Sequence, residues 1–179
     1  MPTAHVIHDQ KRFALTIERL CRHLIENHGD FSSSCLIGIQ AGGVLLGKRI
    51  LERLEDLTGK KVPFGKLDIT FYRDDFRTRN KPLEAHPTEI DFLLEDKRVI
   101  LLDDVLFSGR TTVSAMNALQ DFGRPRQVEL LVLVDRRFKR VVPVQANYFG
   151  IKVDTLGDAY VDVQWEETDG QDQIILLGS

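Results

Sequence analysis

The sequence has few features of an exported, membrane-bound or strongly basic protein. Its 179 residues include two cysteines, Cys21 and Cys35, which lie in apolar patterns and are expected to be buried free thiols rather than a disulfide framework. No apolar run approaches the length of a membrane span, and the N-terminus lacks a basic flank followed by an apolar stretch. The net charge of -3 argues against sequence-independent nucleic-acid binding, although a local basic patch remains compatible with it. We therefore expect a cytoplasmic protein.

Metal-ligating patterns are also lacking. The chain has five histidines, and His5 and His8 have the spacing of a ligand pair. No cysteine and no second histidine pair matches them, so a zinc site is not predicted. We expect these two histidines to lie at a frayed, exposed N-terminus.

Helical and strand periods alternate along the chain, with no repeat, linker or low-complexity tract. This alternation predicts one α/β domain over residues 1–179, with a parallel sheet flanked by helices. Residues 67–72 have the alternation of a strand with one polar face, and the polar residues 74–89 predict a long functional loop. Asp9 is a candidate N-cap, and Gly29 and Gly59 are candidate helix ends. The other predicted elements are helices over 10–28, between the 40–43 turn and Gly59, and over 111–122, and strands over 35–39, 99–102, 128–134, 160–165 and 174–177.

The most informative segment is 99–112, where a buried strand runs into two carboxylates and then into Ser-Gly-Arg-Thr-Thr at a helix start. Gly109 lets the backbone approach an anion, and the hydroxyls of Ser108, Thr111 and Thr112 join the free N–H groups of the helix start in a phosphate cradle with Arg110. Asp103 and Asp104 would repel a phosphate, but they suit a pair of hydroxyls or a hydrated Mg²⁺. The segment therefore predicts a ribose-phosphate site. The alternative is an acidic turn before a Ser/Thr N-cap.

This segment resembles the signature of the type I phosphoribosyltransferases. Further likeness in 67–75, 123–125 and 133–136 makes the chain most similar to the bifunctional pyrimidine-operon attenuator and uracil phosphoribosyltransferase family, over about residues 6–167. The resemblance implies a parallel sheet with a small hood, whose loop would cover about 73–89. It also implies that Asp103 and Asp104 contact the ribose hydroxyls and Mg²⁺, and that residues 108–112 hold the 5′-phosphate.

The same resemblance assigns residues to the pyrophosphate and to the base. Arg73 would act in catalysis by offsetting the charge of the departing pyrophosphate, within a hood segment of Tyr72, Arg73, Asp74 and Asp75. Purine-specific relatives place an acid where this chain has Phe107, and a phenyl ring cannot act as a general base. We therefore expect uracil as the base. The candidate base-binding residues are Phe107, Val134, Asp135, Arg136 and Arg137.

Two departures from the family pattern stand out. The expected pyrophosphate loop, Gln40-Ala41-Gly42-Gly43, lacks the basic side chain of the family's Thr-Arg-Gly. Positions where the attenuators bind a messenger leader carry Glu18, Arg22, Gln145 and Ile151, and an acidic side chain repels phosphate. The basic cluster 136–140 could bind RNA, line a subunit interface or be a solvated turn.

Three functional hypotheses follow. The first is Mg²⁺-assisted transfer of phosphoribose from phosphoribosyl pyrophosphate to uracil, which gives UMP and pyrophosphate. The second is a regulator of pyrimidine genes that binds leader RNA and senses nucleotides. The third is transfer to another base, such as a purine. The resemblance also implies a homodimer or homotetramer.

Overall fold

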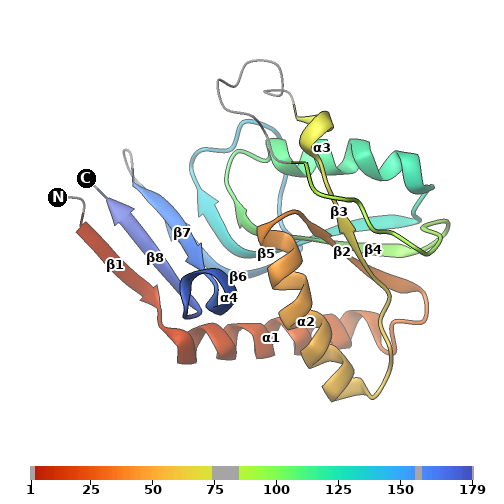
Figure 1. Cartoon of the computed structure of the whole chain (residues 1–179), viewed down its shortest axis with the longest axis horizontal. Coiled ribbons are helices and arrows are strands. Elements are labelled where there is room, and N and C mark those ends of the chain that lie inside the picture. Colours follow the sequence, from red (N-terminus) through yellow and green to blue (C-terminus); the bar gives the residue numbers. More distant parts are fainter. Residues whose placement is uncertain (1–2, 74–84, 156–158, 179) are drawn as a thin grey trace.

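The computed structural model describes residues 3–73, 85–155 and 159–178, which form two sheets (Figure 1). The larger sheet is parallel, with the strand order β3-β2-β4-β5-β6, as predicted. Its strands are β2 (Ser34–Ile39), β3 (Phe64–Leu67), β4 (Arg98–Leu106), β5 (Gln127–Arg137) and β6 (Tyr148–Asp154). The smaller sheet is antiparallel, with the order β1-β8-β7, and comprises β1 (Thr3–His8), β7 (Tyr160–Gln164) and β8 (Gln173–Gly178).

Helices cover both faces of the parallel sheet. Helices α1 (Gln10–His28) and α2 (Gly42–Thr58) pack on one face, and α3 (Arg110–Leu119) packs on the other (Figure 1). The alternation within β4 divides the core accordingly: Ile100 and Leu102 join the cluster under α1 and α2, and Val99 and Leu101 join the cluster under α3. The remaining elements are the short helices η1 (Thr70–Tyr72), η2 (Gln120–Phe122) and α4 (Glu166–Asp169).

Local signals set the helix boundaries. The Asp9 carboxylate accepts a hydrogen bond from the Arg12 N–H at 2.8 Å, which caps α1. At the other end, Gly29 has φ 58° and its N–H donates to the Ile25 carbonyl. Gly59 ends α2 in the left-handed conformation. These three predicted boundaries are confirmed.

Two predictions about strands were wrong. The predicted strand over 67–72 ends at Leu67, because the Asp68 carboxylate accepts hydrogen bonds from the N–H and hydroxyl of Thr70 and turns the chain into η1. The N-terminus is not frayed from residue 3 onward: β1 pairs antiparallel with β8 over the register Thr3↔Gly178 to Val6↔Ile175. Sequence periodicity does not reveal a pairing partner at the opposite end of the chain.

The smaller sheet stands beside the carboxyl ends of the parallel strands. Strand β7 contacts β4, and the C-terminal part of β5 is tied to the chain just before β7 by a hydrogen bond from Arg136 to the Ala159 carbonyl at 2.9 Å. The hood was expected around the loop 73–89, of which residues 74–84 lie outside the described residues. The pairing of the two ends of the chain in a sheet beside the parallel one was not predicted from the sequence.

Candidate functional site

The acidic pair lies in the C-terminal half of β4, which extends past the predicted end at Leu102 to Leu106. Asp103 is 8% exposed, and its carboxylate accepts the Asp104 N–H at 3.0 Å. The Asp104 carboxylate in turn accepts the Val105 N–H at 2.8 Å. Each acidic side chain is thus oriented by the backbone of the next residue.

The surroundings of the pair disfavour negative charge. Burial raises the pKa of Asp103 well above its ordinary value, the neighbouring Asp104 adds to this, and Arg73 lowers it. Burial also raises the pKa of Asp104, and Asp162 on β7 acts in the same direction. Such a pair is stabilised by a cation or by hydroxyl donors, which are the partners predicted from the sequence.

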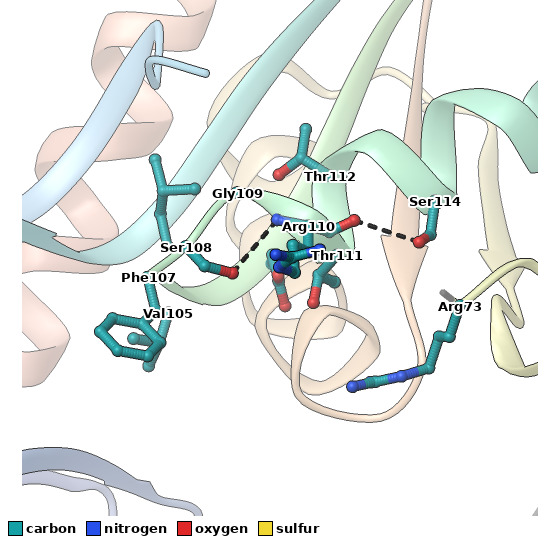
Figure 2. Close-up of a pocket in the computed structure, with 11 residues that line it drawn as sticks. Arg73, Val105, Phe107, Ser108, Gly109, Arg110, Thr111, Thr112 and Ser114 are labelled. Atoms are coloured by element: carbon teal, nitrogen blue, oxygen red, sulfur yellow. Dashed lines mark hydrogen bonds between the residues drawn. The ribbon is translucent and has the colours of Figure 1, made fainter. Parts of the chain in front are cut away.

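The β4–α3 segment, residues 107–112, follows the acidic pair. Gly109 has φ 88° and is the N-cap of α3. The Arg110 N–H donates to the Ser108 hydroxyl at 3.3 Å, and Thr112 is buried in the first turn (Figure 2). The first N–H groups of α3 and the adjacent hydroxyls thus form the predicted anion cradle.

A cavity of about 540 Å³ joins these groups. Arg73 extends toward the cradle from the side opposite to the Phe107 ring (Figure 2). Asp103 therefore shares one cavity with the cradle, whereas Asp104 lies beneath the turn that follows β2. The lining residues are Arg73, Asp103, the continuous run 105–112 and Ser114.

The turn 40–43 lies directly over Asp104. A Cβ atom on Gly42 would lie 2.2 Å from the Asp104 Oδ2 atom, and one on Gly43 would lie 2.1 Å from the Leu102 carbonyl oxygen. The peptide bond between Gln40 and Ala41 is cis. The turn can approach the acidic strand this closely only because both positions are glycine.

The residues at the end of β5 have different surroundings. The Arg136 guanidinium lies 4.0 Å from the centroid of the Phe107 ring and donates to the Thr155 hydroxyl at 3.1 Å. Val134 is fully buried. Of the five base candidates, Phe107 lines the cavity, and Val134, Asp135 and Arg136 lie behind it.

Arg137 is not brought to the cavity. Its guanidinium pairs with Asp154 on the neighbouring strand β6 at 2.5 Å, with both side chains about half exposed. Tyr72 in η1 donates its hydroxyl to Asp121, away from the cavity, while Asp74 and Asp75 lie outside the described residues.

Comparison with known proteins identifies the family. The model of the phosphoribosyl transferase domain matches residues 4–168. This chain belongs to that family. It is 44% identical to the bifunctional protein PyrR of Desulfosudis oleivorans over 88% of this chain and 87% of the relative. It is 39% identical to that of Elusimicrobium minutum over 96% of each chain.

Solved structures of other phosphoribosyltransferases share the fold. The hypoxanthine phosphoribosyltransferase of Trypanosoma cruzi superposes with a TM-score of 0.72 at 15% identity, covering 97% of this chain and 95% of that one. The hypoxanthine-guanine phosphoribosyltransferase of Bacillus anthracis gives 0.72 at 16% identity, covering 98% of both. At this identity the likeness confirms the predicted α/β class and parallel sheet, and carries nothing about the base.

Sequence reasoning missed two residues of this phosphoribosyltransferase site. Asp162 approaches Asp104 from β7, and nothing in its local sequence distinguishes it from a solvent-facing strand residue. Arg140 donates to the Phe107 carbonyl oxygen at 2.5 Å and to the Asp135 carboxylate at 2.7 Å. Arg140 belongs to the basic cluster 136–140, but the cluster alone does not indicate its partners, Phe107 after β4 and Asp135 in β5.

Three arginines of the basic cluster 136–140 have partners within the chain. Arg136 is buried against Phe107, and Arg137 and Arg140 each pair with a carboxylate of the chain. Arg136 and Arg140 therefore join segments of the fold beside the cavity and are not simply solvated, whereas Arg137 is in an ion pair that is about half exposed. On α1, Glu18 pairs with Arg22 at 2.7 Å and with Arg53, which neutralises the acidic position noted in the sequence.

Proposed function

We propose that this protein transfers phosphoribose from phosphoribosyl pyrophosphate to uracil, yielding UMP and pyrophosphate. The observation that carries the proposal is the cavity in which the Asp103 carboxylate faces the N–H-rich start of α3. The acid can accept hydrogen bonds from the two ribose hydroxyls, and the adjacent anion cradle can hold the 5′-phosphate of the same sugar. The identity of about 40% to proteins named bifunctional PyrR supports a pyrimidine substrate.

Each part of the site then has a role. Asp103 and Asp104 would accept hydrogen bonds from the ribose hydroxyls, and Ser108 to Thr112 would hold the 5′-phosphate. Arg73 and the backbone of turn 40–43 would face the pyrophosphate. The bond from the ribose carbon to the pyrophosphate oxygen breaks, the bond to the uracil ring nitrogen forms, and the nitrogen's proton leaves to solvent. Catalysis would rest on positioning and on stabilisation of the departing charge.

A magnesium ion fits this site as part of the substrate complex. Among the described residues, no group of three or more His, Cys, Asp or Glu side chains could hold a metal by itself. Mg²⁺ commonly binds through one or two carboxylates together with substrate phosphates and water. Asp103, supported by Asp104, would supply the carboxylate, and the ion would neutralise pyrophosphate charge.

Uracil is favoured over purines because of Phe107. The Phe107 ring lines the cavity, and Phe107 occupies the sequence position at which, by the family resemblance, purine-specific relatives have an acid. The Phe107 ring also packs against the Arg136 guanidinium, so it combines an apolar edge with a cation held against its face. The base would meet this ring and the backbone at the end of β5.

The test is product formation from phosphoribosyl pyrophosphate and a panel of uracil, hypoxanthine, guanine and adenine, with and without Mg²⁺. UMP formation that is lost in Asp103→Asn supports the proposal. A preference for a purine would refute the choice of base, and full activity of Asp103→Asn would refute the site. Light scattering on the same sample measures whether the chain is the expected homodimer or homotetramer.

RNA binding is the second candidate, because the relatives are named bifunctional, which leaves room for an activity beside the transferase. The basic side chains 136, 137 and 140 pair within the chain, which leaves this candidate with less support than the transferase. A gel shift with a pyrimidine leader RNA, repeated at increasing salt, decides it. Retention that weakens steeply with salt would establish a binding surface.

No helix among the described ranges is long and apolar enough to cross a membrane. We keep the cytoplasm as the proposed location, and fractionation of cells that express the protein measures it.

A further inference from the structure

Arg140 joins the ends of two neighbouring strands without lining the cavity. Its two terminal nitrogens donate to different acceptors, Nη1 to the Phe107 carbonyl oxygen at 2.5 Å and Nη2 to the Asp135 carboxylate at 2.7 Å. Leu106, which precedes Phe107, pairs with Asp135 between β4 and β5. The guanidinium therefore joins the residue that follows β4 to the C-terminal part of β5.

The next residues continue this contact along the β4–α3 segment. The Val141 N–H donates to the Ser108 carbonyl oxygen at 2.9 Å. A Cβ atom on Gly109 would lie 2.7 Å from the Val142 side chain. Phe107, Ser108 and Gly109 are thus contacted in order by the three consecutive residues 140–142 that follow β5.

This arrangement determines which backbone groups of the segment face the cavity. A loop that binds an anion must present its N–H groups and turn its carbonyl oxygens away, because carbonyl dipoles repel the anion. The carbonyl oxygens of Phe107 and Ser108 accept hydrogen bonds from Arg140 and Val141, neither of which lines the cavity. Of the first N–H groups of α3, that of Arg110 donates to the Ser108 hydroxyl, so those of Thr111 and Thr112 are the ones that the helix start offers to a ligand.

We propose that Arg140 is a positioning residue for phosphoribosyl pyrophosphate, acting through the Phe107 carbonyl and the Asp135 carboxylate. The inference rests on the proposed function and names one residue that maintains its phosphate-binding loop. Arginine suits the task because its planar fork reaches two acceptors at once, whereas a lysine ammonium reaches one well. The Arg140 side chain is 25% exposed, so its contacts are partly protected from solvent competition.

The experiment compares Arg140→Gln, Arg140→Lys and a control, Arg49→Gln. Arg49 is 23% exposed and also bridges two acceptors, Glu167 and Asp172, at a place remote from the cavity. The measurements are the Kd of phosphoribosyl pyrophosphate with Mg²⁺ by calorimetry, steady-state KM and kcat with uracil, and Tm. Arg140→Gln should weaken phosphoribosyl pyrophosphate about tenfold, the size of one charge-assisted hydrogen bond. Arg140→Lys should recover part of this loss, and Arg49→Gln should lower Tm without changing the Kd.

Equal Kd values in Arg140→Gln, Arg49→Gln and the wild type would overturn the proposal and leave Arg140 a stabilising residue only. If Arg140→Gln does not fold, Arg140→Lys decides, because unchanged Kd and KM in that variant contradict the need for two donors. Calorimetry needs no base, so a wild type that binds phosphoribosyl pyrophosphate without converting uracil refutes the proposed function and still tests Arg140.

Discussion

Gly42 is the position where a single methyl group should damage the site. It begins α2, and a Cβ there would lie 2.2 Å from the Oδ2 atom and 2.4 Å from the Cγ atom of Asp104. Non-bonded carbon and oxygen atoms need about 3.5 Å, so in Gly42→Ala the carboxylate must move by roughly 1 Å. That movement weakens its hydrogen bond from the Val105 N–H, now 2.8 Å long.

Two effects oppose each other in Gly42→Ala. Loss of a hydrogen bond to a charged group costs about 1.5–3 kcal/mol. Replacing glycine by alanine in a helix stabilises by about 0.5–1 kcal/mol. The net destabilisation should therefore be about 1–2 kcal/mol, which lowers Tm by roughly 2–8 °C in a domain of this size. The displaced carboxylate should also raise KM for phosphoribosyl pyrophosphate.

Thermal unfolding and steady-state kinetics test this reasoning, with Gly178→Ala as the control. A Cβ on Gly178 meets nothing closer than Ala159 at 3.9 Å, so this variant should keep its Tm and activity. Gly42→Arg restores the cation of the family pattern but carries the same Cβ, so it should be no better than Gly42→Ala. A Gly42→Arg variant with unchanged Tm and tighter phosphoribosyl pyrophosphate binding would refute the argument from the contact.

Three further predictions concern the acidic pair, the core and the base. Burial raises the pKa of Asp103, so above the ordinary pKa of an aspartate its carboxyl group destabilises the folded state. Asp103→Asn should therefore lose activity but have a higher Tm than the wild type near pH 7. This difference in Tm should shrink as the pH falls toward about 4. Burial lowers the pKa of His28 against the opposing effect of Glu129, so near pH 6 the folded state binds fewer protons at this residue than the unfolded state does. The wild-type Tm should therefore fall as the pH drops below about 6.5, and it should fall more steeply than the Tm of His28→Gln. Parallel curves of Tm against pH for the two proteins would contradict this prediction. Phe107→Ala removes the ring 4.0 Å from Arg136 and should raise KM for uracil about tenfold with little change for phosphoribosyl pyrophosphate; equal effects on both would exclude a base-side role.

The sequence alone determined the features that depend on neighbours along the chain. Residues 99–112 contain a strand, an acidic pair, a glycine turn and a helix start in one continuous run, so their arrangement could be predicted without tertiary information. The caps at Asp9, Gly29 and Gly59 are equally local. The alternation of strands and helices predicted the parallel sheet, which the structure confirms. Family resemblance added the roles of these residues, and the comparisons confirm the family while the roles remain proposals.

Only the tertiary structure decided the contacts between distant segments. The Gly42 backbone meets Asp104, Arg140 reaches back to Phe107, and β1 pairs with β8, although each pair is separated by many residues in the chain. Side-chain periods report which face of an element is buried, but they do not report what covers it. The sequence of a basic cluster such as 136–140 does not reveal whether its side chains face solvent or carboxylates, because only folding sets the distance between opposite charges.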